Sequence, residues 1–116
     1  MKKKFLPAFR GLWDAAHERS VQIQMILGAV TVCFGIFLSL DKTEWLAVII
    51  LIGCVISAEI FNAVCEKLCD LYTKEKCEEI RVIKDMAAGA VLGMSIAALA
   101  AGAVIFLPKI IGRISG

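Results

Sequence analysis

The sequence predicts an all-α membrane protein with three transmembrane helices and an N-terminal amphipathic helix at the interface. Apolar residues make up 59% of the 116-residue chain, and the mean hydropathy of +0.81 is too high for an ordinary water-soluble domain. Two runs carry no charge, Val21 to Leu40 and Met86 to Pro108, and a third, Trp45 to Cys65, has Glu59 as its only charged residue. At about 1.5 Å per residue, the two uncharged runs can cross a hydrocarbon core of ~30 Å, and the third can do so only if Glu59 is tolerated there.

The domain organisation follows from these runs. We expect a single integral-membrane domain over residues 1–116, because three spans leave no segment long enough for a second core. Its elements are a surface helix within 1–20 and helices over 21–40, 44–70 and 86–108, with Pro7 delaying the start of the first. The first apolar run is expected to stay as a span, because it is long and lacks the cleavage pattern of a signal peptide.

The basic residues predict the orientation of the spans. Five precede the first span and five lie between the second and third, whereas the link between the first two spans holds only Lys42, and Lys109 and Arg113 follow the last. The positive-inside rule therefore places the N-terminus and the second loop in the cytoplasm, and the C-terminus outside.

Small residues distinguish the third span, which includes a Gly89-x-x-x-Gly93 pair. Small residues allow helix backbones to approach closely, so this helix is expected inside a bundle and not against lipid.

The five cysteines are expected to be structural or incidental, because they lack the Cys-x-x-Cys pairs of a zinc site and the only histidine, His17, is remote in sequence.

Four polar residues of the second span lie on one helical face, because their spacings are three, four and four: Glu59, Asn62, Glu66 and Asp70. An ionisable group at membrane depth costs a few kcal/mol and is by default a functional hypothesis. The alternative for Glu59 is an acid that snorkels to the interface and pairs with a lysine such as Lys67. For Asp70 the alternative is a solvated surface acid.

Further charged residues adjoin the membrane on the same side. Glu18 reaches the level of Glu66 if the first two spans pack side by side, and two carboxylates there favour Mg²⁺, which takes oxygen ligands and bridges nucleotide phosphates. The alternative is two acids that are exposed independently. Lys84 and Asp85 are expected at the start of the third helix, where Lys84 can hold a phosphate and Asp85 can cap the helix, although capping and membrane anchoring alone also explain both.

Together these groups suit phosphoryl transfer to a lipid hydroxyl, which needs a base near the headgroups, a metal ion and a positive charge on the nucleotide. No Walker motif occurs in the sequence. The alternative is a non-enzymatic small oligomeric membrane protein, a channel or transporter subunit whose acidic stripe lines an ion path. The polar residues stop at Glu59, so a path from side to side is not visible.

Two segments resemble the signature of the small prokaryotic diacylglycerol kinase family, which includes undecaprenol kinases. They are Glu59-Ile-Phe-Asn-Ala-Val-Cys-Glu-Lys-Leu-Cys-Asp70 and Lys84-Asp-Met-Ala-Ala-Gly-Ala-Val91. Glu18-Arg19 before the first span and Phe106-Leu-Pro-Lys109 after the last are most similar to the Gram-positive branch of undecaprenol kinases. The sequence departs from the family's pattern at several positions, among them Ser20, Cys65 and Cys77.

The resemblance implies a homotrimer, with active sites shared between subunits, that transfers the γ-phosphate of ATP to a membrane lipid alcohol, undecaprenol in preference to diacylglycerol. It implies a bacterial cell membrane with the active site on the cytoplasmic face, and no nucleic-acid partner. Glu59 matches the catalytic base, and Glu18 and Glu66 match the Mg²⁺ ligands. The implied nucleotide-binding residues are Glu18, Glu66, Glu75, Lys76, Cys77, Lys84 and Asp85, with Asn62 and Asp70 as further polar residues of the site.

Overall fold

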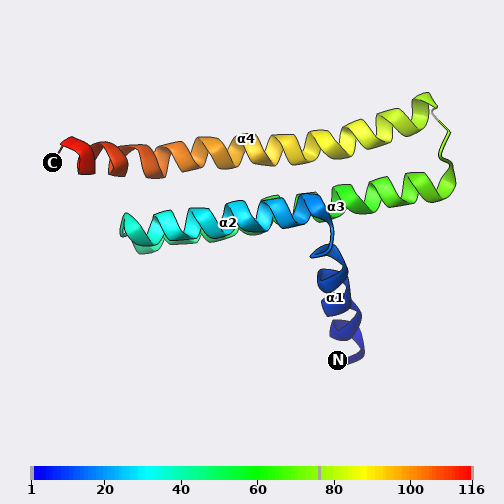
Figure 1. The fold of residues 1–116 in the computed structure, drawn as a ribbon, viewed down its shortest axis with the longest axis horizontal. Coiled ribbons are helices and arrows are strands. Elements are labelled where there is room, and N and C mark those ends of the chain that lie inside the picture. The colour runs from blue at the N-terminus through cyan, green and yellow to red at the C-terminus, as the bar shows by residue number, and fades with distance from the viewer. Residues whose placement is uncertain (1, 76, 116) are drawn as a thin grey trace.

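Helix α3, Lys42–Tyr72, is the element on which the other two long helices pack (Figure 1). The structure, a computed structural model, describes residues 2–75 and 77–115, with side chains from Phe5 onward. Within them the order is α1 Lys2–Ala15, α2 Arg19–Phe37, α3 and α4 Glu78–Ser115, with no strand. Three of these helices, α2, α3 and α4, are long and apolar enough to cross a membrane, which confirms the predicted fold class.

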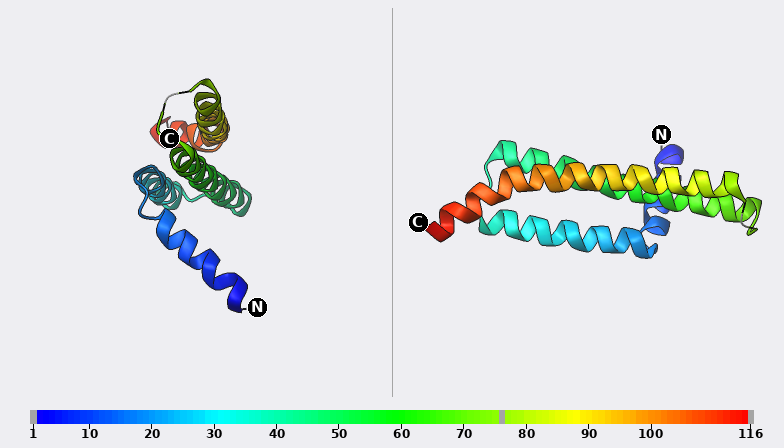
Figure 2. Two further views of the ribbon diagram at one scale, coloured as in Figure 1. Left: turned by 90° about the vertical axis from the view of Figure 1, so that its right-hand side faces the viewer. Right: turned by 90° about the horizontal axis from the view of Figure 1, so that it is seen from above.

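Helix α1 runs across the direction of the three long helices (Figures 1 and 2). Its large apolar side chains are exposed, namely Phe5, Leu6, Phe9, Leu12 and Trp13. The expectation that Pro7 delays the helix is wrong, because α1 already begins at Lys2 and contains Pro7. Pro7 is the sixth residue of α1, so the helix runs through it with the loss of one backbone hydrogen bond, because proline has no N–H to donate to the carbonyl four residues earlier.

The link between α2 and α3 is a tight turn with a reciprocal cap. Helix α2 ends at Phe37, three residues earlier than the apolar run, because Ser39 adopts a left-handed conformation (φ 56°). Asp41 then caps α3: its Oδ1 accepts from the amide of Glu44 at 2.9 Å, while the amide of Asp41 donates to Glu44 Oε1 at 3.0 Å. This capping box defines the first turn of α3.

Helix α2 packs on α3 through residues spaced seven apart, Val21, Gly28 and Gly35, which are all buried. A Cβ atom at Gly28 would lie 3.1 Å from Cγ2 of Ile52, and one at Gly35 would lie 2.8 Å from Cη2 of Trp45. The seven-residue spacing keeps one face toward the neighbour, as in left-handed helix pairs. Glycine is therefore required for the close approach of α2 to α3.

Helix α4 packs on α3 along one face only. Val91 is its one buried residue, and Gly89 and Gly93 lie on the opposite face, where an added Cβ would meet no atom within 4 Å. Within one chain the small-residue pair thus contacts no other helix, so the expectation of a helix inside a bundle stays a prediction about the assembly. The helix also begins eight residues earlier than predicted and continues past Pro108 to Ser115.

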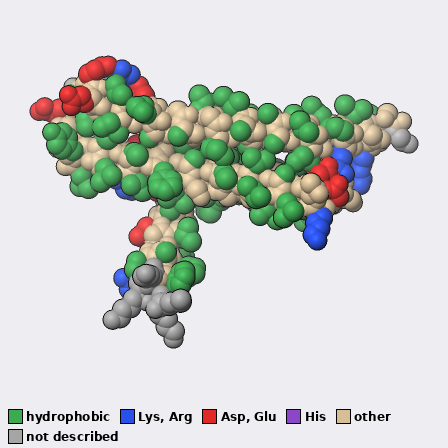
Figure 3. Space-filling view, turned by 180° about the vertical axis from the view of Figure 1, so that it is seen from behind, with side chains coloured by type: hydrophobic (Ala, Val, Ile, Leu, Met, Phe, Trp, Pro, Cys, Tyr) green, Lys and Arg blue, Asp and Glu red, His purple; other side chains and the backbone are tan. Residues whose placement is uncertain are grey.

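Charged side chains gather at both ends of the long helices, with hydrophobic side chains between them (Figure 3). At the end that holds the α2–α3 turn, Lys109 of α4 pairs with Glu44 of α3 at 3.1 Å. Arg113 donates to the Phe37 carbonyl at 2.8 Å and stacks over that ring at 4.6 Å. These contacts fasten the far end of α4 to α2 and α3.

The close approach at Gly35 generates a stability prediction. Gly35→Ala forces the Trp45 ring or Leu40 to move, so we expect a loss of about 1–3 kcal/mol. Gly53→Ala is the matched control, because a Cβ at Gly53 meets nothing within 4 Å and alanine is the better helix former. Thermal unfolding in detergent measures both variants, and equal stabilities would contradict the close packing.

Candidate active site

Glu59 is a buried acid on α3. Its exposed fraction is 8%, and it shares the buried face of the helix with Val55 and Ala63. Glu59 forms no ion pair with any described residue, and Lys67 pairs with a different acid. The alternative in which Glu59 pairs with Lys67 is therefore wrong. A buried carboxyl group without a cation partner is costly unless another group or a ligand satisfies it.

Asn62 follows on the next turn of α3, and its Oδ1 is buried without a hydrogen-bond partner among the described residues. Buried polar atoms nearly always have a hydrogen-bond partner, so this acceptor suits a donor such as a water molecule or a bound ligand. Glu66, one turn further, is exposed. The polar stripe of α3 therefore passes from buried to exposed as the helix approaches the α3–α4 loop.

Glu18 lies at the start of α2 and reaches across to α3. Its Oε1 is 2.7 Å from Nζ of Lys67, the residue after Glu66. Glu18 occupies the N-cap position of α2, but its side chain makes no capping hydrogen bond. The hydrogen bond to Glu18 raises the pKa of Lys67 above its ordinary value. The pair thus aligns the start of α2 with the level of Glu66 on α3.

Asp70 and Lys84 form the second contact between helices at this end, with Oδ1 and Nζ 2.9 Å apart. The hydrogen bond to Asp70 raises the pKa of Lys84, partial burial opposes this, and the negative charges of Asp70 and Glu66 add to the increase. Asp70 is therefore not simply a solvated acid beside its sequence neighbours, because it links α3 to α4. Lys84 lies within electrostatic reach of Glu66.

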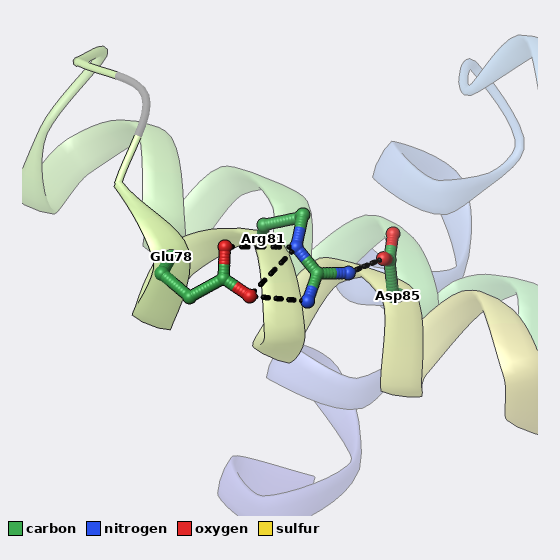
Figure 4. Close-up of polar contacts among 3 residues, drawn as sticks. All are labelled: Glu78, Arg81 and Asp85. Atoms are coloured by element: carbon green, nitrogen blue, oxygen red, sulfur yellow. Dashed lines mark hydrogen bonds and ion pairs between the residues drawn. The ribbon is translucent and has the colours of Figure 1, made fainter.

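Arg81 binds two acids on the same helix (Figure 4). Its guanidinium group pairs with Glu78 and donates to Oδ2 of Asp85 at 2.6 Å. The expectation that Lys84 and Asp85 start the helix is wrong, because α4 begins at Glu78. The pairs at i,i+3 and i,i+4 favour helix through this charged segment, so Asp85 cannot serve as the cap. The positions of Glu78 and Asp85, three residues before and four residues after Arg81, are the feature of the sequence that indicates these ion pairs.

The α3–α4 loop carries the other expected nucleotide contacts. The amide of Glu75 donates to Oγ1 of Thr73 at 3.0 Å. Lys76 lies outside the described residues. Cys77 is exposed, and its carbonyl accepts the first hydrogen bond of α4, from Arg81 at 3.0 Å.

Three cysteines line one pocket of about 410 Å³ between the ends of α3 and α4, namely Cys65, Cys69 and Cys77. All three are free thiols. Across residues 2–75 and 77–115, no group of three or more His, Cys, Asp or Glu residues could hold a metal ion. Mg²⁺ needs no such group, since it is bound by one or two carboxylates together with waters and substrate phosphates. Glu18 and Glu66 supply carboxylate oxygens, the ligand type that Mg²⁺ takes.

An apolar cavity of about 660 Å³ lies between α2, α3 and α4. Its floor on α3 includes Val55 and Ile56, one turn from Glu59, and its few polar lining residues are Gln24, Thr31 and Ser95. Glu59 therefore lies between an apolar cavity on one side and the charged groups near the α3–α4 loop on the other.

The fold and the site define a small multi-pass membrane protein with a buried acid and paired charges at one end of its spans. The model of the prokaryotic diacylglycerol kinase family matches residues 7–106. The undecaprenol kinase of Bacillus subtilis (strain 168) is 34% identical over 109 residues, which cover 93% of this chain and 89% of that protein. The chain belongs to the prokaryotic diacylglycerol kinase family, and it is a lipid kinase. Family membership thus favours the enzyme over a channel or transporter subunit.

The contact between Asp70 and Lys84 predicts a measurable change in pKa. Asp70→Asn removes the largest cause of the raised Lys84 pKa, so that pKa should fall toward the ordinary value of 10.5. In the unaltered protein the stabilisation from this pair is present at neutral pH and is lost as the pH rises through the raised pKa of Lys84. An NMR titration of the lysine ammonium groups measures the shift, and an unchanged Lys84 titration would exclude the contact.

Proposed function

We propose that this lipid kinase transfers the γ-phosphate of ATP to undecaprenol, in preference to diacylglycerol, with Mg²⁺ and with Glu59 as the general base. The observation that supports this most is the position of Glu59. Its side chain is buried, forms no ion pair with a described residue, and lies between an apolar cavity and a charged surface. A base in that position can meet the hydroxyl group of a lipid from one side and a nucleotide from the other. The lipid preference rests on the relative from Bacillus subtilis, which is an undecaprenol kinase.

In the proposed reaction the carboxylate of Glu59 accepts the proton of the lipid hydroxyl group as its oxygen attacks the γ-phosphorus atom. The bond from that phosphorus atom to the bridging oxygen breaks, and ADP leaves. Glu18 and Glu66 hold Mg²⁺, which neutralises charge on the phosphates when it is bound. Lys84, positioned by Asp70, presents its ammonium group to a phosphate.

The other nucleotide contacts belong to the start of α4 and the loop before it. We assign Glu75, Lys76, Cys77 and Asp85 to the nucleotide, together with Glu18, Glu66 and Lys84. Asp85 is held in place by Arg81. Asn62 carries a buried acceptor without a partner on the face that also bears Glu59, which suits a hydrogen bond to the substrate or to a bound water.

We further propose that the active site faces the cytoplasm of a bacterial cell and is shared between the subunits of a homotrimer. The distribution of lysine and arginine supports the orientation. The open face of α4 supports assembly, because Gly89 and Gly93 there let a helix of another subunit approach closely.

If α4 contacts another subunit through its glycines, a large side chain in place of one of them should disrupt the trimer. Gly93→Leu should lower the mass of the protein in detergent from that of a trimer to smaller species, because the added side chain separates the helices. Gly112→Leu, the same change at another open glycine of α4, should leave the mass unchanged. Light scattering coupled to size-exclusion chromatography measures both. A trimer that persists in Gly93→Leu would count against an interface on this face.

The reaction itself predicts a loss of turnover in Glu59→Gln. Removal of the base should lower kcat by about 100-fold or more, while binding of Mg²⁺ and nucleotide remains. The assay uses purified protein in lipid–detergent micelles with radiolabelled ATP, and offers undecaprenol and diacylglycerol in parallel at equal mole fraction. Asp14→Asn, a change of an exposed acid on α1, is the control.

Each outcome of that assay decides one part of the proposal. More label in undecaprenol than in diacylglycerol, lost in Glu59→Gln and kept in Asp14→Asn, is the expected result. The reverse lipid preference would contradict the assignment of undecaprenol and leave the mechanism intact. Full activity of Glu59→Gln would exclude Glu59 as the base.

A further inference from the structure

The contact between Glu18 and Lys67 involves a lysine to which no role in the reaction has yet been assigned. Lys67 Nζ lies 2.7 Å from Glu18 Oε1, and the two side chains are 67% and 33% exposed. Glu18 stands at the N-cap of α2, yet its carboxylate makes no capping bond to its own helix. The side chain is instead directed to the ammonium group on α3.

This ion pair occupies the carboxylate that the proposed function assigns to Mg²⁺. An ammonium group at hydrogen-bond distance and a divalent cation at about 2.0–2.1 Å compete for the same oxygen atoms and repel each other. Lys67 therefore excludes Mg²⁺ from Oε1 of Glu18 and weakens by charge repulsion any binding of Mg²⁺ at the other carboxylate oxygen. The cost of exchanging Lys67 for Mg²⁺ lowers the affinity of the free protein for the cation.

Lys67 is free to make that exchange. Two thirds of its side chain is exposed, and its ammonium group lies at the end of a flexible four-carbon stem. Asp70, the acid one turn further along the same helix face, is already paired with Lys84. A metal–nucleotide complex brings its own anionic oxygen atoms, so the phosphates are the partner that can replace Glu18.

We propose that Lys67 is a resident counter-ion, which holds the carboxylate of Glu18 in the empty protein and moves to the nucleotide phosphates when the metal–nucleotide complex binds. The inference rests on the proposed role of Glu18 as a metal ligand. Only ion pairs are exchanged, and no covalent bond forms or breaks. Lys67 thereby disfavours the bare cation and favours the cation that arrives with its nucleotide.

Two measurements on Lys67→Met should then change in opposite directions. Mn²⁺ serves as the probe for the metal, and electron paramagnetic resonance of the free ion measures its binding to purified protein without nucleotide. We expect Lys67→Met to bind Mn²⁺ about 2- to 5-fold more tightly, in line with the loss of an exposed ion pair. The KM for the magnesium–nucleotide complex should rise by a similar factor, and Lys67→Arg should restore both values.

The controls separate this inference from the proposed function. Lys74→Met changes an exposed lysine of the α3–α4 loop and should alter neither measurement. Glu18→Gln should weaken Mn²⁺ binding in the otherwise unaltered protein. If Glu18→Gln leaves Mn²⁺ binding unchanged, the metal role of Glu18 fails and this inference fails with it. In the other case, Glu18→Gln weakens Mn²⁺ binding, but Lys67→Met has the same Mn²⁺ affinity as Lys74→Met or a lower one. That result would overturn the counter-ion role of Lys67 and leave the metal role of Glu18 intact.

Discussion

The arrangement of the site depends on the unequal lengths of the helices. Helix α3 has 31 residues and extends about 46 Å, whereas a hydrocarbon core is ~30 Å thick. Helix α2 has 19 residues, about 28 Å, so it is just long enough to cross. With the two helices joined by a tight turn at one end, α3 must project beyond α2 at the other. The pair of Glu18 and Lys67 marks the level at which α2 begins. Glu59, eight residues before Lys67, lies about 12 Å from that level along α3, in the direction of the α2–α3 turn.

Packing on α3 leaves room for substrates. Helices α2 and α4 each contact α3 along one face, and the space between them is the apolar cavity that approaches Glu59. Close approach through Gly28 and Gly35 holds α2 in register, while the ion pair of Asp70 with Lys84 and the contacts of Lys109 and Arg113 fasten α4 at both ends. The hydrophobic contacts and these charged contacts together keep a buried carboxyl group at a fixed depth. The burial of Glu59 opposes stability, and such a cost is typical of groups retained for chemistry.

Much of this could be predicted from the sequence, because hydrophobic length and helical spacing are local properties. The three spans follow from the apolar runs, and the common face of Glu59, Asn62, Glu66 and Asp70 follows from the 3.6-residue period. Contacts between helices were harder to predict. The sequence offers Lys67 as a partner for Glu59, yet the structure pairs Lys67 with Glu18. The apolar pattern does not predict the early start of α4, because the segment before Met86 is charged, although the ion pairs of Arg81 favour helix there. The open face of α4 has no partner within one chain, so no single-chain pattern could assign one.

We propose that α3 carries Glu59 just inside the hydrocarbon and Glu66 and Asp70 beyond it. Spin labels at two exposed positions of α3, Phe61 and Leu68, test this without replacing the site residues. Accessibility to oxygen and to a water-soluble nickel complex, measured in lipid bilayers, reports the depth of each label. We expect the label at position 61 to lie within the hydrocarbon and the label at position 68 to lie about 10 Å further out, among the headgroups or in water. Two labels at the same depth in the hydrocarbon, or a label at position 61 in water, would contradict it.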